Sequence, residues 1–253
     1  MSTISVKAMA LIPARYGSTR LPAKALALID GVPMIQRVYS NMAKGNFEVA
    51  VVTDHDAIEN CIKKIGGRVL RIDDDLQTGS ERIGFAYKRH LKNENFDFIV
   101  NVQGDEPLLE AHSINQLLQF HAKSSFDITT LYFERIGSDD FDNPNTVKIA
   151  LNQKTGNCLY FSRLPIPFYR QNKNTSSWKW FQHVGVYCFR PHILEQFITL
   201  PSSPLELAET LEQLRALEEG YRVGATAIQH LPQSVDTAED IVKVERLLLE
   251  KKE

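Results

Sequence analysis

Three basic side chains lie close together in residues 11–24, whose sequence is LIPARYGSTRLPAK. Arg15, Arg20 and Lys24 can converge on a polyphosphate, because guanidinium and ammonium groups donate several hydrogen bonds to phosphate oxygens. Gly17 and Ser18 supply a tight backbone turn and a hydroxyl donor. The stretch therefore predicts an anion site, and the alternative is a solvated basic loop whose cations pair with surface acids.

The same stretch contains neither of the common glycine-rich phosphate motifs. G-x-G-x-x-G would indicate a dinucleotide, and G-x-x-x-x-G-K-[ST] would indicate a P-loop. Because the first pattern is absent, a nicotinamide-dependent oxidoreductase is disfavoured.

A second informative stretch, VNVQGDEPLL, is an apolar run that ends abruptly in polar residues. Gln103, Gly104, Asp105 and Glu106 follow the run, and Pro107 stops it. A carboxylate beside a polyphosphate site most plausibly holds Mg²⁺, which prefers oxygen ligands and shares its shell with phosphates. The alternative is a turn in which Asp105 only accepts hydrogen bonds from backbone N–H groups.

Three further stretches are ambiguous when taken alone. Asp236 precedes the last predicted helix, where an N-cap role is sufficient to explain it. In QTGSERI (77–83), the first turn of a helix has capping residues that need no ligand. His183 and Tyr187 lie four residues apart in a predicted strand and so share a face, where a lone histidine is more often structural than catalytic.

The elements that position these residues alternate regularly in the first half of the chain. Nearly all-apolar runs at 7–14, 47–54, 68–72 and 97–104 predict strands buried on both faces, separated by predicted helices at 33–44, 55–65, 80–92 and 112–123. This alternation is typical of a doubly wound, Rossmann-like parallel sheet. Ligands in such sheets bind beyond the carboxyl ends of the strands, where both the basic loop and Asp105 fall.

The second half is less regular. Strands are predicted at 127–133, 146–152, 157–163, 181–189 and 222–228, and the polar segment 170–179 is predicted to be a mobile loop. Two helices follow, one over SPLELAETLEQLRALEEG (203–220) and one over DTAEDIVKVERLLLEKKE (236–253). In the second helix, Thr237 and Asp240 have the spacing of a capping box. A single domain over 1–253 with inserted or appended elements is favoured.

The composition is that of an ordinary globular protein, with 253 residues, 43% hydrophobic and 24% charged. A net charge of -2 gives no reason to expect nucleic acid or an anionic membrane surface as a partner. Cys61, Cys158 and Cys188 are far apart, so reduced thiols are expected. The N-terminus is predicted to be a first strand and not a signal peptide, no run approaches the ~20 apolar residues of a membrane helix, and a cytoplasmic location is expected.

The order of these motifs resembles that of a known family. The stretches IPARYGSTRLPAK, VVTDH, QTGSERI, VNVQGDEPLL, NPNTVKI, YFSRLPIP, QHVGVYCF, LEQLRAL and VDTAEDI together resemble the 3-deoxy-manno-octulosonate cytidylyltransferases, also called CMP-Kdo synthetases. The resemblance runs from about residue 8 to 247.

The resemblance implies a reaction in which the anomeric hydroxyl of 3-deoxy-D-manno-octulosonate (Kdo) attacks the α-phosphorus of CTP. CMP-Kdo, for lipopolysaccharide biosynthesis, and pyrophosphate would be the products. The implied fold is a three-layer, Rossmann-like α/β nucleotidyltransferase with a mostly parallel central sheet. Its nucleotide-binding core would cover about 8–125 and 205–247, with a sugar-binding and dimerisation portion at about 126–204. A homodimer is also implied.

The resemblance also assigns roles to residues of this chain. Lys24, Asp105 and Asp236 would be catalytic, and the two aspartates would hold Mg²⁺. The residues that match the nucleotide-binding segments are Ala14, Arg15, Ser18, Arg20, Lys24, Thr78, Gly79, Ser80, Arg82 and Gln103. Those that match the sugar-acid positions are Gln103, Arg163, His183, Tyr187, Glu212 and Gln213, with Arg163 pairing with the sugar carboxylate.

Three positions depart from the family pattern. Ala23 stands where the family usually has glycine, Gln182 where it usually has arginine, and Ser80 where threonine is common. Because none is a proposed metal ligand, activity is expected to survive. Two alternatives remain: the same chemistry on another ulosonate, such as 8-amino-Kdo or a neuraminate-type acid, and a CTP-binding sensor that has lost turnover.

Overall fold

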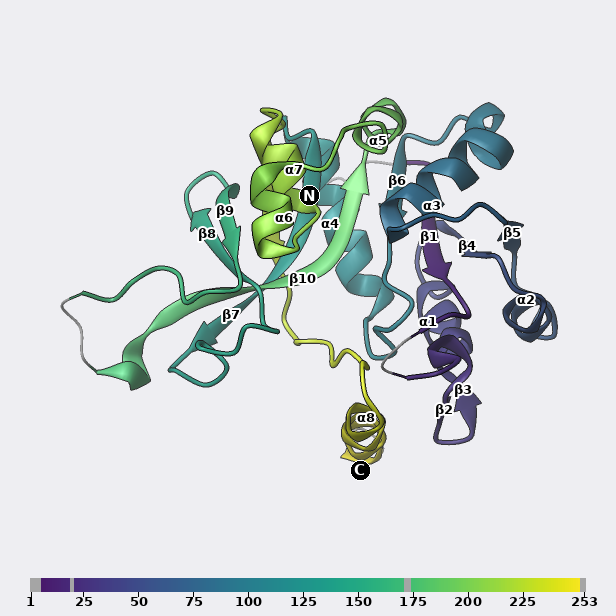
Figure 1. Ribbon diagram of the computed structural model, residues 1–253, viewed down its shortest axis with the longest axis horizontal. Coiled ribbons are helices and arrows are strands. Elements are labelled where there is room, and N and C mark those ends of the chain that lie inside the picture. Colours follow the sequence, from purple (N-terminus) through teal and green to yellow (C-terminus); the bar gives the residue numbers. More distant parts are fainter. Residues whose placement is uncertain (1–5, 19–20, 171–173, 251–253) are drawn as a thin grey trace. The chain divides into compact units, whose positions relative to one another are not determined.

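The structure is a computed structural model that describes residues 6–18, 21–170 and 174–250. The chain forms two compact units, one built from residues 1–118 and 232–253 and the other from residues 119–231 (Figure 1). The segment 205–231 therefore falls in the second unit, whereas the sequence had grouped it with the nucleotide-binding core. Each unit is described separately below.

The first unit contains a parallel sheet with the strand order β5-β4-β1-β6. Its strands are β1 (Ala8–Ala14), β4 (Glu48–Thr53), β5 (Val69–Arg71) and β6 (Phe98–Asn101). All four match predicted strands, and their near-continuous burial reflects apolar residues on both faces. β1 pairs with β4 on one side and with β6 on the other, so the strand order reverses at β1.

Helices connect these strands as the hydrophobic periodicity predicts. They are α1 (Met34–Met42), α2 (Asp56–Lys63), α3 (Gly79–Ala86), α4 (Ala111–Lys123) and the C-terminal α8 (Ala238–Glu250). A π-helical turn, η2 (Tyr87–Leu91), and a 3₁₀ turn, η3 (Lys92–Glu94), extend α3, and a 3₁₀ turn, η1 (Lys24–Leu26), follows the basic loop. α8 packs on the small hairpin β2 (Leu28–Ile29) and β3 (Val32–Pro33), because Val244 and Val235 share a buried cluster with Ile29 and Met34.

The second unit is a mixed sheet with the order β10-β7-β11-β9-β8. Its strands are β7 (Ile128–Ile136), β8 (Lys148–Asn152), β9 (Asn157–Ser162), β10 (Lys179–Phe189) and β11 (Val223–Ala227). β11 runs parallel to β7, and the other pairings within the unit are antiparallel. An additional pairing of β10 with β8, at Gln182 and Lys148, closes the five strands on themselves. The long β10 reaches both neighbours with a bulge between Val184 and Tyr187.

The predicted single helix over 203–220 is wrong. The structure has two short helices there, α6 (Pro204–Glu209) and α7 (Gln213–Glu218), in addition to α5 (Pro191–Phe197). Thr210 separates them with left-handed backbone angles, φ 53° and ψ 50°. The buried ion pair between Arg215 and Glu206, with nitrogen and oxygen 2.5 Å apart, joins the two helices, so a tertiary contact overrides the helical pattern of the sequence.

Predictions about the cysteines, about membrane helices and about the loop at 170–179 can also be compared with the structure. Cys61, Cys158 and Cys188 are all buried and free, as expected. Among the helices that the structure describes, none is long and apolar enough to cross a membrane. Residues 171–173 of the predicted mobile loop lie outside the described residues, and a 3₁₀ turn, η4 (Thr175–Ser177), follows them.

Candidate functional site

The carboxyl end of β1 is the topological switch point of the first unit's sheet. The loops that follow β1 and β6 leave the sheet on the two sides of this point, and such a crevice is the usual ligand site of an open parallel sheet. A cavity of about 290 Å³ lies there. Eight of the predicted nucleotide-binding residues line it: Ala14, Arg15, Ser18, Lys24, Thr78, Gly79, Arg82 and Gln103.

Lys24, Asp105 and Asp236 meet at the cavity although they come from three distant parts of the chain. The Lys24 ammonium donates to Asp105 Oδ2 at 2.6 Å and to Asp236 Oδ1 at 2.7 Å. Burial lowers the pKa of Lys24, but the attraction and hydrogen bonds of both aspartates outweigh burial and raise this pKa above its usual value. Lys24 is thus firmly protonated and joins two carboxylates that would otherwise repel each other.

The position of Asp236 is set by its neighbours. The backbone N–H of Val235 donates to the Asp105 carbonyl at 3.0 Å, so the two aspartate segments are joined directly. The Asp236 backbone N–H donates to Asp240 at 3.1 Å in the first turn of α8. The burial of Val235 beside α8 then anchors the segment.

Two glycines allow the loops around the cavity to approach each other. A Cβ atom on Gly104 would lie 2.8 Å from the Pro13 carbonyl oxygen, which is too close for any side chain. A Cβ atom on Gly79 would lie 3.1 Å from the Pro13 ring. The end of β1 is therefore packed tightly against the loops after β6 and before α3.

The QTGSERI segment caps α3 and also lines the cavity. Thr78 and Glu81 form a reciprocal capping box, so the Thr78 hydroxyl is used within the helix end. Ser80 is buried and does not line the cavity, and its hydroxyl accepts a hydrogen bond from Asn101 Nδ2 at 3.2 Å. Both observations give these hydroxyls structural partners.

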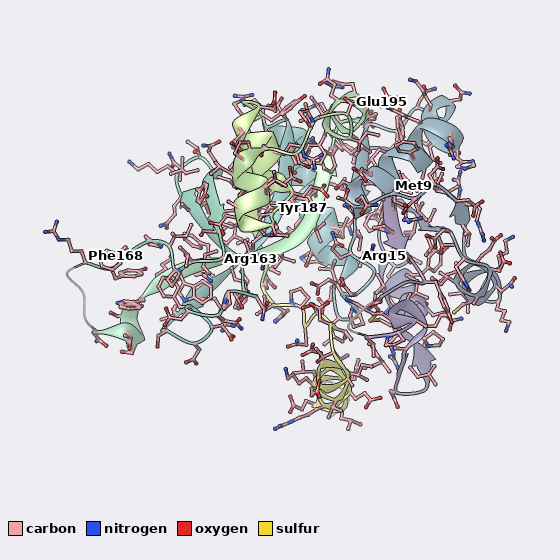
Figure 2. All side chains as sticks on the ribbon, in the orientation of Figure 1. Met9, Arg15, Arg163, Phe168, Tyr187 and Glu195 are labelled. Carbon is pink, nitrogen blue, oxygen red and sulfur yellow. The ribbon has the colours of Figure 1, made fainter. Side chains whose placement is uncertain are left out.

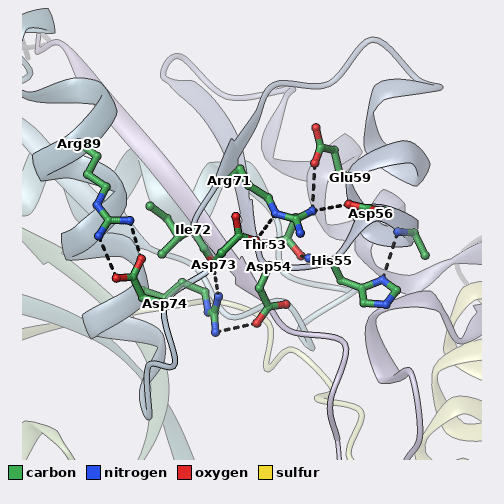
Figure 3. A network of polar contacts seen from close by, with 12 residues as sticks. Thr53, Asp54, His55, Asp56, Glu59, Arg71, Ile72, Asp73, Asp74 and Arg89 are labelled. Atoms are coloured by element: carbon green, nitrogen blue, oxygen red, sulfur yellow. Dashed lines mark hydrogen bonds and ion pairs between the residues drawn. The ribbon is translucent and has the colours of Figure 1, made fainter.

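The buried Arg82 side chain is fixed at one wall of the cavity. Its guanidinium donates to the Ile72 carbonyl at 3.1 Å and pairs with the Asp54 carboxylate at 3.0 Å (Figure 3). Such double anchoring holds a guanidinium in one orientation. Sequence reasoning named Arg82 but missed Asp54, whose only signal was its place in the VVTDH stretch.

An aromatic stack supports the basic loop. The Tyr16 ring lies on the His55 ring with centroids 3.8 Å apart and planes at 12°. His55 is in turn fixed as the N-cap of α2, since its Nδ1 accepts from the Ala57 N–H at 3.1 Å (Figure 3). Neither residue was picked out from the sequence. Arg15 is exposed beside this stack, and Arg20 lies outside the described residues.

The predicted sugar-acid residues of the second unit come from three elements: His183 and Tyr187 lie on β10, Arg163 follows β9, and Glu212 and Gln213 begin α7; Figure 2 labels Arg163 and Tyr187. Tyr187, Glu212 and Gln213 line a cavity of about 10 Å³, which holds about one water molecule and no sugar. Gln213 is buried, and its Nε2 donor has no hydrogen-bond partner within the described part of the chain. A buried donor without a partner is a costly arrangement that a polar ligand would relieve.

His183 is a neutral donor and acceptor within this cluster. Its Nε2 lies 3.0 Å from Thr130 Oγ1, and the same hydroxyl lies 2.7 Å from the Val186 carbonyl. Because the hydroxyl proton goes to the carbonyl, Nε2 must carry the ring proton and Nδ1 is left as the acceptor. Burial lowers the pKa of His183 to about 3, so the ring is uncharged at neutral pH.

The chain as a whole is similar to known proteins. The sequence model of the family described as cytidylyltransferase matches residues 9–228. The chain belongs to the cytidylyltransferase family. Two relatives named 3-deoxy-manno-octulosonate cytidylyltransferase, from Parabacteroides distasonis and Francisella philomiragia, are each 40% identical over 245 and 243 residues, covering 94% of this chain and 96% of the relative.

Solved structures agree with this assignment. A CMP:2-keto-3-deoxy-manno-octonic acid synthetase solved in complex with CTP is 34% identical, with a TM-score of 0.88, and the match covers 97% of this chain and 99% of that one. A cytidylyltransferase from Leptospira borgpetersenii, 18% identical with a TM-score of 0.61 over 97% and 88%, shares the fold. The protein thus has the mixed α/β nucleotidyltransferase fold.

The departure at Ala23 has a clear structural meaning in this cytidylyltransferase. Ala23 has φ 50° and ψ 35°, the left-handed conformation that glycine adopts readily and that a Cβ atom disfavours. Its carbonyl accepts the Leu26 N–H at 2.7 Å and so begins the η1 turn that carries Lys24. The turn keeps its shape despite the methyl group.

Ala23→Gly is therefore expected to stabilise the protein. Relief of the left-handed strain is worth about 1 kcal/mol, reduced by the greater freedom of glycine in the unfolded chain, and the melting temperature should rise by about 2–4 °C at most. Thermal unfolding of both forms measures the shift. Ala43→Gly is the control, because Ala43 has φ -63° and should only be destabilised. A lower melting temperature for Ala23→Gly would contradict this account.

Gln182, the second departure, is partly buried on β10. Its Oε1 acceptor has no hydrogen-bond partner among the residues described. Glu106, which the sequence already placed beside Asp105, is buried: burial and the charge of Asp105 raise its pKa well above the usual value. The sequence did not indicate that the Gln182 amide oxygen and the Glu106 carboxyl group are buried.

Acid should destabilise the protein through its buried histidines. The folded-state pKa is lowered by burial to about 3 for His183 and to about 4 for His121, so only the unfolded chain takes up these protons below about pH 6.5. The free energy of unfolding should therefore fall by on the order of 1–2 kcal/mol per histidine between pH 6.5 and 5.

Urea unfolding at pH 7, 6 and 5 measures this loss. His183→Gln should reduce the fall in the free energy of unfolding between pH 7 and pH 5 by the contribution of one histidine. His192→Gln, at an exposed position, should leave this fall unchanged. An unaltered pH dependence in His183→Gln would show that His183 takes up its proton equally readily in the folded and unfolded states, and would contradict this account.

Proposed function

We propose that this cytidylyltransferase transfers the cytidylyl group of CTP to the anomeric hydroxyl of Kdo, giving CMP-Kdo and pyrophosphate. The observation that carries the proposal is the 34% identity, over nearly the whole chain, to a synthetase of this name solved with CTP. The convergence of Lys24, Asp105 and Asp236 on a cavity at the switch point supports it independently.

The triphosphate is proposed to bind at the loop after β1. Arg15 and Ser18 line the cavity beside Lys24, so two cations and a hydroxyl can reach phosphate oxygens. The backbone around Ala14 and the fixed Arg82 are available for the cytidine portion. These contacts hold the α-phosphorus in place, which is the main requirement for phosphoryl-type displacement.

Mg²⁺ is proposed to bind at Asp105 and Asp236. Both carboxylates already converge on one cation, the Lys24 ammonium, and their oxygen atoms are the donors that Mg²⁺ prefers. Two carboxylates would leave coordination positions of the metal for phosphate oxygens and water. When bound, the metal would neutralise charge on the phosphates and favour deprotonation of the attacking hydroxyl.

The reaction needs no covalent intermediate with the protein. The sugar oxygen forms a bond to the α-phosphorus, the bond from that phosphorus to the β-phosphate bridging oxygen breaks, and the hydroxyl proton is lost. Lys24 is placed to balance the charge of the departing pyrophosphate. Arg163, His183 and Gln213 supply a cation, an acceptor and a donor for the sugar acid.

A second substrate is supported by one relative. A protein from Shewanella frigidimarina named 8-amino-3,8-dideoxy-manno-octulosonate cytidylyltransferase is 39% identical over 244 residues, covering 95% of this chain and 98% of its own length. The two sugars differ at one substituent, which a few hydrogen bonds discriminate. Kdo remains the better-supported substrate because more relatives carry that name.

A homodimer is part of the proposal. Large apolar side chains are exposed on the second unit, with Ile136 71% and Phe168 86% accessible. A second copy of the chain would cover such side chains and remove their apolar surface from water. Light scattering after gel filtration measures the mass, and a monomer at micromolar concentration would contradict this part.

The test of the proposed function is pyrophosphate release from CTP and Mg²⁺ with Kdo, 8-amino-Kdo and N-acetylneuraminate in parallel, with a control that lacks sugar. Kdo is expected to be the best substrate. Preference for another acid would keep the chemistry and change the substrate. CTP binding without release with any sugar would identify a sensor instead of an enzyme.

A further inference from the structure

We propose that Glu209 is a positioning residue, which holds Arg163 in the orientation that receives the carboxylate of the sugar acid. The inference rests on the proposed function and deepens it, since it names what fixes the specificity for an acidic sugar. Glu209 ends α6, and Arg163 follows β9.

The Glu209 carboxylate does not contact the guanidinium of Arg163. Instead, Oε2 accepts the Arg163 backbone N–H at 2.8 Å, and Oε1 accepts the Ser162 hydroxyl at 2.7 Å and the Tyr160 hydroxyl at 3.4 Å. The acid therefore fixes the backbone from which the Arg163 side chain extends. Its negative charge is satisfied by donors of β9 and does not neutralise the arginine directly.

The Arg163 guanidinium is held by neutral groups alone. Nε donates to the Glu209 carbonyl at 2.7 Å, Nη1 to the Pro144 carbonyl at 2.9 Å and Nη2 to the Thr210 carbonyl at 3.2 Å. No carboxylate forms an ion pair with Arg163 among residues 6–18, 21–170 and 174–250. Since a guanidinium has five N–H groups, two remain for a ligand. An arginine that is fixed but not neutralised is well suited to bind a carboxylate.

The Thr210 backbone is bent into the unusual conformation that this arrangement requires. Thr210 is β-branched and has φ 53°, a left-handed backbone conformation that its Cβ atom disfavours. The bend ends α6 and turns the Glu209 and Thr210 carbonyls toward the arginine, so the two hydrogen bonds that Arg163 donates to these carbonyls depend on it. Strain that is kept in place by several contacts is typical of a functional site.

Lys148 also holds the backbone of Arg163. It is fully buried, and its ammonium donates to the carbonyls of Asn143 at 2.9 Å, Thr146 at 2.7 Å and Arg163 at 2.6 Å. All three ammonium protons are therefore used, two in hydrogen bonds to residues 143–146 and one to Arg163. Lys148 thus links the Arg163 backbone to the segment that contains the Pro144 acceptor. Lys148 is a second positioning residue of the same unit.

The experiment compares Glu209→Gln, Glu209→Ala and Arg163→Ala with the Glu209→Ala/Arg163→Ala double variant. The KM for Kdo should rise roughly tenfold or more in each single variant, while the KM for CTP stays within about twofold. If Glu209 acts through Arg163, the double variant should have the same KM for Kdo as Arg163→Ala alone. The exposed Glu219→Gln is the matched control and should leave both KM values unchanged.

A second substrate separates positioning from general destabilisation. The wild type should strongly prefer Kdo over its C1 carboxamide, and this preference should shrink in Glu209→Ala and in Lys148→Met but not in the exposed Lys154→Met. Should Glu209→Ala fail to fold, Glu209→Gln, which keeps one acceptor, carries the same comparison.

The inference would be overturned by equal increases in both KM values, or by additive effects of Glu209→Ala and Arg163→Ala on the KM for Kdo. An unchanged carboxamide preference in the Glu209 variants would overturn it as well. Failure of the wild type to release pyrophosphate with Kdo would instead overturn the proposed function, so the two failures are distinguishable.

Discussion

Asp105→Asn is expected to reduce turnover roughly a thousandfold while the protein stays folded, because it removes one of the two carboxylates proposed to hold Mg²⁺, and loss of one part of a preorganised electrostatic site costs about this much. Asparagine keeps the size of the side chain but removes the charge that the Lys24 ammonium contacts at 2.6 Å. The Val235 N–H donates to the Asp105 backbone carbonyl and not to its side chain. This hydrogen bond between the two aspartate segments should therefore persist in the variant. CTP should still bind through the basic loop.

Steady-state pyrophosphate release and CTP titration measure the two effects separately. Asp236→Asn should behave similarly, since Asp236 contacts the same ammonium at 2.7 Å. The control is Asp142→Asn, which changes an exposed aspartate of the second unit. Turnover close to that of the wild type in Asp105→Asn would remove its assignment as a metal ligand.

Lys24→Met is expected to lower turnover as severely but to strengthen metal binding in the absence of nucleotide. In the structure the Lys24 ammonium lies between Asp105 and Asp236, the two residues proposed to hold a divalent cation. Removal of this internal cation leaves two carboxylates that repel each other, and a divalent ion relieves the repulsion. The affinity of the free protein for Mn²⁺ should rise roughly tenfold or more.

Mn²⁺ titration of the nucleotide-free protein, followed by electron paramagnetic resonance, gives this affinity without any turnover. Lys63→Met is the matched control, because Lys63 pairs with Glu59 on the exposed face of α2. Equal or weaker Mn²⁺ binding by Lys24→Met would mean that the lysine and the metal do not compete for one position.

Much of the first unit could be predicted from the sequence, because its signals are local. The strands and helices that alternate through 7–123 are read from apolar runs and helical periodicity, and both depend on neighbouring residues alone. The edge at which Arg15 and Asp105 lie also follows, since parallel strands place their carboxyl ends together. The family resemblance added Asp236, which local reasoning treats as a helix cap.

Other features depend on contacts between distant residues and were decided by the tertiary structure. Lys24 and Asp236 are 212 positions apart, and the packing of Val235 under α8 brings them together. The break at Thr210 contradicts the helical pattern around it and is held by Arg163 and by the Arg215–Glu206 pair. Gly104 is needed because Pro13 of another strand lies against it. The sequence determined the elements and the edge of the sheet where chemistry occurs, whereas long-range packing and hydrogen bonding decided which charged groups meet there, because the energies of those contacts exceed local conformational preferences.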